Sequence, residues 1–266
     1  GVSSVQVSTN TTNIWTISSA DTSYAYLSGV LIDISLSSIS GIFVENGVLN
    51  HVMVVGDSAP HGAFGIGAWT VDVYSGIMLA QALGRNAWRG LPEAAIDTWV
   101  ASYNAITGSV QVTNLKDNLI VIAGYGVNLL TYEYFTDFRG AFSSGRQPLA
   151  PVYFHRDWTP NPADVRTWIV FPGEPLTYSD WDIVSGFSDY CLIELVYDRQ
   201  NGRVVLGVTS FTAQGTEAGC RALAAMLMGQ SLPFNISGQA VLLKWVDGNV
   251  DGKVQLSEIS LVKTYR

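Results

Sequence analysis

A stretch near the end of the chain carries the residue types and the spacing of a calcium-binding loop. Residues 247–258 read DGNVDGKVQLSE and match the pattern D-x-[DN]-x-[DN]-G, five further residues and Glu at every required position. Calcium is a hard cation that binds oxygen, which this loop supplies from side chains and, at Lys253, from the backbone carbonyl. The predicted calcium ligands are Asp247, Asn249, Asp251, Lys253, Gln255 and Glu258.

The alternative interpretation of this loop is a polar hairpin turn, because Asp-Gly pairs also form turns. The complete match favours calcium: Gly252 occupies the position of the sharp turn, and Val254 is the apolar residue expected to anchor the loop to the core. Sensor EF-hands work by reorienting a pair of helices. A lone EF-hand-like loop at this end of the chain is therefore better interpreted as a clip that orders the last segment.

A second group of residues could do different chemistry. Asp57, Ser58, His61 and Asp72 include the residue types of a serine hydrolase, but the Gly-x-Ser-x-Gly elbow is absent. A secreted hydrolase around Asp57, Ser58 and His61 is kept as an alternative function. The eight Trp residues also leave a calcium-dependent glycan-binding module open, although they are better explained as core and interface anchors.

The composition narrows the class of protein. Charged residues make up only 14% of the 266 residues and hydrophobic residues 48%, yet no run is long and apolar enough to predict a membrane span. We expect the surplus apolar surface to face other copies of the chain, because monomers rarely expose large apolar patches. The net charge of −8 argues against nucleic acid as a partner and suits extracellular calcium.

Several weaker signals favour a protein outside the cell. The chain starts at Gly1 without Met, which suggests a processed N-terminus. Sequons at Asn10 and Asn235 are candidate sites of N-glycosylation. Cys191 and Cys220 permit one disulfide in an oxidising compartment, and two buried free thiols are the equal alternative.

The pattern of apolar residues predicts a mixed α+β chain. Residues 1–50 alternate like β-strands, with strands expected at 30–34 and 42–44. Three units of strand, glycine-containing loop and helix follow, which predicts an α/β layer. The strands of these units are expected at 51–57, 118–124 and 203–209, and the helices at 70–83, 127–135 and 216–228, the last with Thr216 as its N-cap. A short helix is also expected at 92–100.

These elements divide the chain into four segments that are compatible with one compact domain. Residues 1–50 form the β-rich N-terminal segment, and residues 51–138 form a first α/β part. Residues 139–190, rich in Pro, Trp and Tyr, are expected to be an insertion of loops and strands. Residues 191–266 form a second α/β part that ends in the calcium loop.

With the three units in view, the sequence resembles archaeal S-layer proteins. Similar strand–glycine–helix blocks come in this order in that family. The matching blocks are Val54–Asp57 with Val71–Val73 and Ala80–Leu83, Leu119–Thr131, and Val205–Thr209 with Gly215–Ala222. The terminal loop also resembles half of a dockerin repeat. The resemblance implies a structural protein at the cell surface.

Together, these observations predict a secreted, non-enzymatic, calcium-stabilised structural subunit that assembles with copies of itself. The assembly would be an archaeal surface layer or an extracellular filament or tube. Because the N-terminus alternates like a strand, residues 1–18 are a candidate for donation to the sheet edge of a neighbouring subunit. An internal edge strand is the alternative for this segment.

Overall fold

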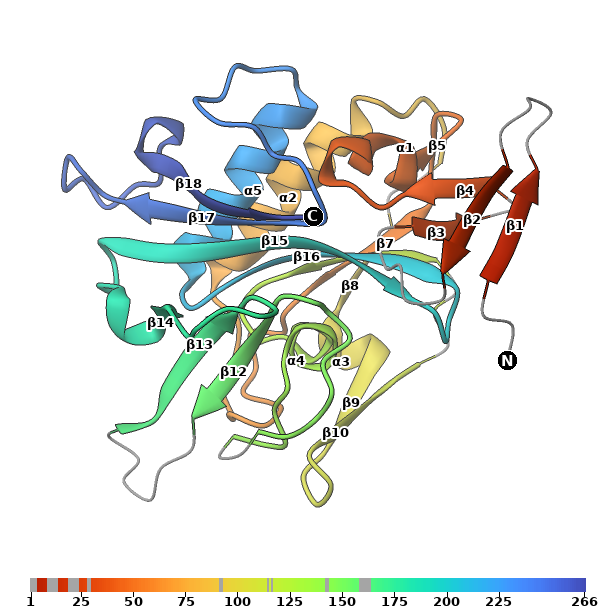
Figure 1. Cartoon of the computed structure of the whole chain (residues 1–266). Helices are drawn as coiled ribbons and strands as arrows, with labels where there is room; N and C mark the ends of the chain where they lie inside the picture. The colour runs from red at the N-terminus through yellow and green to blue at the C-terminus, as the bar shows by residue number, and fades with distance from the viewer. Residues whose placement is uncertain are drawn as a thin grey trace.

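The fold is built on a seven-stranded mixed sheet, shown in the computed structural model of Figure 1. The structure describes residues 4–8, 14–18, 24–27, 30–90, 93–113, 115, 117–141, 144–157 and 164–266. In spatial order, the strands of the sheet are β18 (Ile259–Tyr265), β17 (Ala240–Val246), β15 (Ser188–Asp198), β16 (Arg203–Ser210), β11 (Asn118–Ile122), β7 (His51–Val55) and β8 (Glu93–Ile96).

One half of the sheet is parallel and the other half antiparallel. Strands β16, β11, β7 and β8 run in the same direction, whereas β15, β17 and β18 pair antiparallel in succession. All five residues of β11 are buried, as expected for a central parallel strand covered on both faces. The apolar runs that the sequence analysis assigned to buried strands therefore form the centre of the sheet.

Helices cover both faces of this sheet (Figure 1). Helices α2 (Thr70–Gly84) and α5 (Ala213–Leu227) pack against each other and share one core with the sheet. Helices α3 (Asp97–Val100) and α4 (Leu129–Phe135) belong to the opposite side, where the residues of α4 form a second core. The three predicted strand–loop–helix units are thus β7–α2, β11–α4 and β16–α5, which confirms the mixed α+β fold class.

The start of α5 differs from the sequence prediction. The N-cap is Thr212 instead of Thr216, because the buried Asp189 carboxylate accepts hydrogen bonds from both the backbone N–H and the hydroxyl of Thr212, each at 2.7 Å. The Thr216 hydroxyl lies one turn inside the helix and pairs with Ser210 Oγ at 2.8 Å. A buried acid from another strand therefore moves the start of the helix, which local sequence does not reveal.

The N-terminal segment is only partly strand. Two hairpins, β1 (Ser4–Ser8) with β2 (Ile14–Ser18) and β3 (Tyr24–Leu27) with β4 (Val30–Asp33), form separate two-stranded sheets. The strand predicted at 42–44 is wrong for its first two residues, which end helix α1 (Ile39–Phe43) because Ile39, Ile42 and Phe43 bury one helical face. This part is completed by η1 (Leu36–Ser38), β5 (Val44–Glu45) and β6 (Val48–Leu49).

The remaining elements are the edge strand β8 and several short elements outside the main sheet. The helix predicted at 92–100 is wrong over Glu93–Ile96, which pair with β7 as edge strand β8, and correct over α3. Residues 139–190 contribute a three-stranded sheet, whereas the main sheet takes strands from both α/β parts. The other elements are β9 (Ala101–Asn104), β10 (Ser109–Val112), β12 (Tyr153–Asp157), β13 (Arg166–Val170), β14 (Tyr178–Ser179), η3 (Asp180–Asp182) and η4 (Leu256–Glu258). No helix in the described part of the chain is long and apolar enough to cross a membrane.

Candidate functional site

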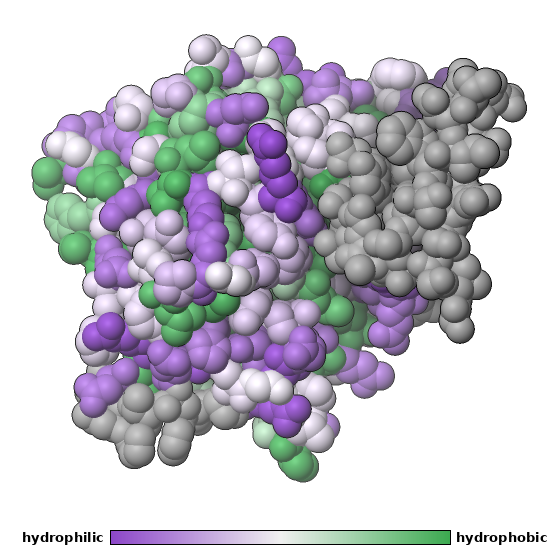
Figure 2. Space-filling model, viewed as in Figure 1, coloured by the Kyte–Doolittle hydropathy of each residue, from purple (hydrophilic) through white to green (hydrophobic). Residues whose placement is uncertain are grey.

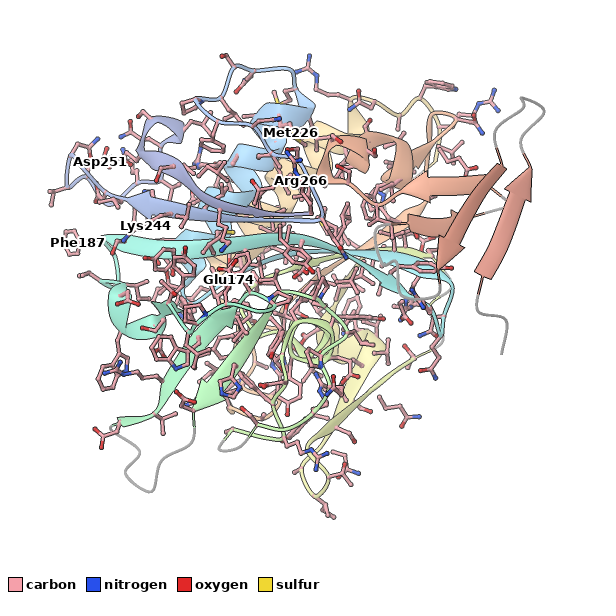
Figure 3. The ribbon with its side chains drawn as sticks, viewed as in Figure 1. Glu174, Phe187, Met226, Lys244, Asp251 and Arg266 are labelled. Atoms are coloured by element: carbon pink, nitrogen blue, oxygen red, sulfur yellow. The ribbon has the colours of Figure 1, made fainter. Side chains whose placement is uncertain are left out.

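The predicted calcium loop connects β17 to β18 at the tip of a hairpin. It is flanked by strands, with the turn of η4 before β18, and not by the paired helices of an EF-hand. Figure 3 shows Asp251 at this tip, with Phe187 at the same end of the molecule. The backbone N–H of Asp247 donates to the carbonyl of Phe187 at 2.8 Å, which fixes the first residue of the loop to the turn before β15.

Hydrogen bonds from backbone N–H groups to side-chain oxygens of the same loop hold it in a compact conformation. Asp247 Oδ2 accepts the backbone N–H of Gly252 at 2.8 Å, and Asn249 Oδ1 accepts that of Asp251 at 3.0 Å. Glu258 Oε1 accepts the backbone N–H of Gly248 at 3.1 Å, so the last predicted ligand lies beside the first. Gly252 has a φ of 70°, in the left-handed region that its predicted turn requires.

One side of the loop packs against the core, and the side that carries the predicted ligands is exposed to solvent. Val254 is buried in the core, as predicted, and the Trp245 indole N–H donates to Glu258 Oε2 at 3.4 Å. Asn249, Asp251 and Lys253 are exposed. The loop therefore has the character of an anchored clip whose polar side faces solvent.

The oxygen-rich donor set fits calcium, but the donors do not converge. Asp251 Oδ1 accepts the backbone N–H of Lys253, and its Oδ2 accepts the side-chain amide of Gln255 at 3.0 Å. Among the described residues, no group of three or more His, Cys, Asp or Glu is placed to hold a metal ion. Calcium binding requires the carboxylates of Asp247, Asp251 and Glu258 to direct free lone pairs of their oxygens toward a common point.

A second polar centre lies where three parallel strands end. The Asp97 carboxylate, fully buried at the end of β8, accepts the backbone N–H of Asp57 after β7 at 2.7 Å. It also accepts the backbone N–H of Leu129, at the start of α4 after β11, at 2.7 Å. Its third partner is His61 Nε2, again at 2.7 Å. Asp97 therefore joins the loops that follow β7, β8 and β11.

His61 in this centre is arranged as a cation. Its Nδ1 lies 2.7 Å from the carbonyl of Ala59, so both ring nitrogens face acceptors and both carry a proton. Burial lowers the pKa of His61, but the Ala59 carbonyl and the Asp97 carboxylate outweigh it and leave the pKa above its usual value. In this arrangement His61 has no lone pair with which to accept a proton from a nucleophile.

The structure does not bring the predicted hydrolase residues together as a triad. Ser58 is exposed, and Asp57 accepts the Thr98 hydroxyl at 2.7 Å and its own loop N–H at Ala59. Asp72 instead lies in the first turn of α2, where its carboxylate accepts the backbone N–H of Trp69 at 3.0 Å. The partner of His61 is Asp97, which the sequence analysis missed; an acid directly after a strand and at the start of a helix was its only sequence signal.

The remaining predicted site residues are distributed over the molecule. Cys191 on β15 and Cys220 on α5 are buried free cysteines, the second of the two alternatives drawn from the sequence. Burial raises the pKa of both thiols, which makes them unreactive. Asn235 is exposed, and its side-chain nitrogen lies 3.5 Å from the Ser237 hydroxyl within the sequon. Asn10 lies outside the described residues.

Comparison of the sequence with models of known protein families and with curated proteins gave no match. Function is therefore inferred from this chain's own residues. The residues that could carry a function are those of the predicted calcium loop, those around Asp97, and the apolar side chains exposed at the surface.

Proposed function

We propose that this chain is a secreted, non-enzymatic structural subunit that assembles with copies of itself and is stabilised by calcium. The assembly is an archaeal surface layer or an extracellular filament or tube, as the resemblance to S-layer proteins implies. The observation that carries the proposal is a patch of exposed apolar side chains beside the calcium loop. The patch consists of Val184, Phe187, Val246 and Val250.

Backbone contacts bring the segments that carry this patch together at one end of the molecule. Phe187 N–H donates to the carbonyl of Val184 at 2.8 Å, and Ser188 pairs in register with Val246. Val250 lies in the calcium loop and is 69% exposed. Figure 2 shows apolar atoms at the left edge of the molecule, where Figure 1 places the β17–β18 hairpin. Burial of such a patch against another subunit would contribute stability in proportion to its apolar area.

Helix α2 provides further apolar surface. Val73, Tyr74 and Ile77 are exposed on the side of α2 that faces away from the core, and Trp69 before its first turn is 64% exposed. A helix that is apolar on all sides is normally buried on all sides. Contacts with a neighbouring subunit would cover this side of α2.

Two unpaired strand edges supply a route to assembly. Within the described residues β18 pairs only with β17, which leaves one edge of a seven-residue strand open. The β1–β2 hairpin belongs to no larger sheet, and isolated two-stranded hairpins are marginally stable in water. Donation of residues 1–18 to the β18 edge of a neighbour would give hydrogen-bond partners to that edge and place the hairpin in a larger sheet.

We expect calcium to raise the melting temperature of the purified chain. Binding to the folded state alone contributes about 2.7 kcal/mol when the free ion is at a hundred times its dissociation constant. For a chain of this size, that corresponds to roughly 5–10 °C. Thermal unfolding in EGTA and in millimolar calcium measures the shift. Asp251→Asn should remove it, whereas Glu45→Gln, an exposed carboxylate outside the loop, should retain it. Equal melting temperatures with and without calcium would contradict a structural ion.

We expect removal of residues 1–18 to abolish polymerisation while the rest of the chain stays folded. The truncated chain keeps the seven-stranded sheet, because β1 and β2 form a two-stranded sheet of their own. Electron microscopy of the purified protein measures assembly, and circular dichroism measures folding. A synthetic peptide of residues 1–18 should block polymerisation of the full chain by occupying the acceptor edge. Long polymers formed by the truncated chain would end the strand-donation hypothesis.

A further inference from the structure

A cavity of about 280 Å³ lies beyond the carboxyl ends of β11 and β16. The chain leaves β16 toward α5 on one face of the sheet and leaves β11 toward α4 on the other face. Ligands of open α/β sheets bind in the crevice that such a change of face creates. Its volume is near the lower end of small-molecule pockets.

Two polar groups of opposite charge line this cavity without a partner. Within the described part of the chain, Asp72 Oδ1 and Arg156 Nε are both buried and have no hydrogen-bond partner. Asp72 is only 2% exposed. Thr216 lies near its carboxyl group, but the Thr216 hydroxyl is bonded to Ser210 at 2.8 Å. A buried polar atom without a hydrogen bond lowers the stability of the fold. A ligand in the cavity that bonds to each of these atoms would remove that cost.

Arg156 is held in place without being neutralised. Its guanidinium stacks on the Phe64 ring at 5.1 Å from the centroid, and it forms no ion pair with any described residue. The stacking orients the guanidinium, and its Nε–H, which has no partner among the described residues, is available for an anion. A carboxylate is the complementary group for such a fork.

The rest of the cavity wall is largely aromatic. Phe64, Tyr125 and Phe211 contribute rings, and Tyr125 is fixed because its hydroxyl donates to Thr167 at 3.2 Å. The exposed side chains of Ile66 and Trp69 also line the cavity. Such walls favour an apolar or aromatic body between the charged ends of a ligand.

We propose that this cavity binds a small zwitterion with an aromatic or apolar body, whose ammonium group pairs with Asp72 and whose carboxylate pairs with Arg156. The ligand satisfies both unpaired atoms at once and balances both charges, whereas a pure anion leaves Asp72 unpaired and a neutral sugar, whose hydroxyls can bond to both atoms, balances neither charge. Burial raises the pKa of Asp72 to about 6, so the carboxyl group is mainly ionised at neutral pH and able to bind a cation. None of the predicted calcium ligands lines this cavity, whereas Trp69 lies both at its wall and on the apolar surface of α2 proposed for assembly.

Isothermal titration of the full-length chain at neutral pH tests the proposal with two zwitterions of different charge separation. The probes are L-phenylalanine and 4-(aminomethyl)benzoate, each compared with analogues that lack one charge: 3-phenylpropanoate and 2-phenylethylamine, or 4-methylbenzoate and benzylamine. We expect one zwitterion to bind at least about tenfold more tightly than both of its analogues, since each charged hydrogen bond is worth that factor or more.

Variants locate the binding. Asp72→Asn keeps the acceptor for Trp69 N–H but presents an amide to the ammonium group, and Arg156→Met removes the guanidinium while retaining an apolar stem. Each should weaken binding about tenfold or more. Arg85→Met, at the far end of α2, should leave the affinity unchanged. Absence of binding by both zwitterions at millimolar concentration, equal binding of a single-charge analogue, or unchanged affinity in Asp72→Asn would each overturn the proposal.

Discussion

Asp97→Ala is expected to lower the free energy of unfolding by roughly 3–5 kcal/mol, the usual cost of breaking a buried charged pair. The substitution leaves the buried N–H groups of Asp57 and Leu129 without their acceptor. It also removes the carboxylate that pairs with the charged ring of His61. Because these three groups belong to loops after different strands, the loss should loosen the whole carboxyl end of the parallel sheet. Urea unfolding followed by circular dichroism measures the change.

A matched control lies four residues earlier on the same edge. Glu93→Gln alters an exposed carboxylate at the start of β8 and should change stability by less than about 0.5 kcal/mol. His61→Ala should cost less than Asp97→Ala, because the two backbone N–H donors keep their acceptor. Equal stability of Asp97→Ala and Glu93→Gln would show that the Asp97 carboxylate does not hold the loops.

The main elements of the fold could be predicted from the sequence, whereas the contacts of Asp97 could not. The runs 51–57, 118–124 and 203–209 predict buried strands because each carries its own apolar signal over a few residues. The helices after them carry equally local signals. The fold class and the three strand–loop–helix units therefore follow from the sequence.

The two polar sites, the one around Asp97 and the one at the cavity, could not be predicted from the sequence, because their residues are far apart in the chain. Asp97 lies 36 residues from His61 and 32 from Leu129, and no local pattern links them. Asp72 and Arg156 come from a helix and from the inserted sheet, and only the folded chain places both at one cavity. The proposed calcium loop is the opposite case, since its candidate ligands lie close together in sequence and the prediction rests on their spacing alone.

Lowering the pH from 8 to 5.5 is expected to stabilise the calcium-free chain, by about 2 kcal/mol through Asp189 alone. Burial raises the pKa of Asp189 to about 7 and that of Glu194 well above its usual range. The folded state keeps protons on these acids that the unfolded state releases above its pKa near 4. The unfolded state therefore binds fewer protons in this window, and stability falls as the pH rises.

The histidines partly reinforce and partly oppose this trend. The Asp137 carboxylate raises the pKa of His155, and acceptors raise that of His61, so both contribute stability that is present below pH 6.5 and lost as the pH rises through the folded pKa. Burial lowers the pKa of His51, which costs stability as the pH falls below 6.5. Burial also raises the pKa of Asp72, to about 6, and that of Asp180. His51 therefore opposes four acids and two histidines, and the net sign is unchanged.

Urea unfolding in EGTA at both pH values measures the effect, and Glu194→Gln isolates its largest source. Glu194 Oε1 accepts the backbone N–H of Val152 at 3.0 Å, while Oε2 has no partner among the described residues. A glutamine can keep that acceptor and stays neutral at every pH, so the stability gained by this variant over the parent chain should be larger at pH 8 than at pH 5.5. Glu45→Gln should retain the full pH dependence of the parent. Stability that rises from pH 5.5 to 8, or a Glu194→Gln variant with the parent's slope, would show that the Glu194 carboxyl group ionises without cost in the folded chain.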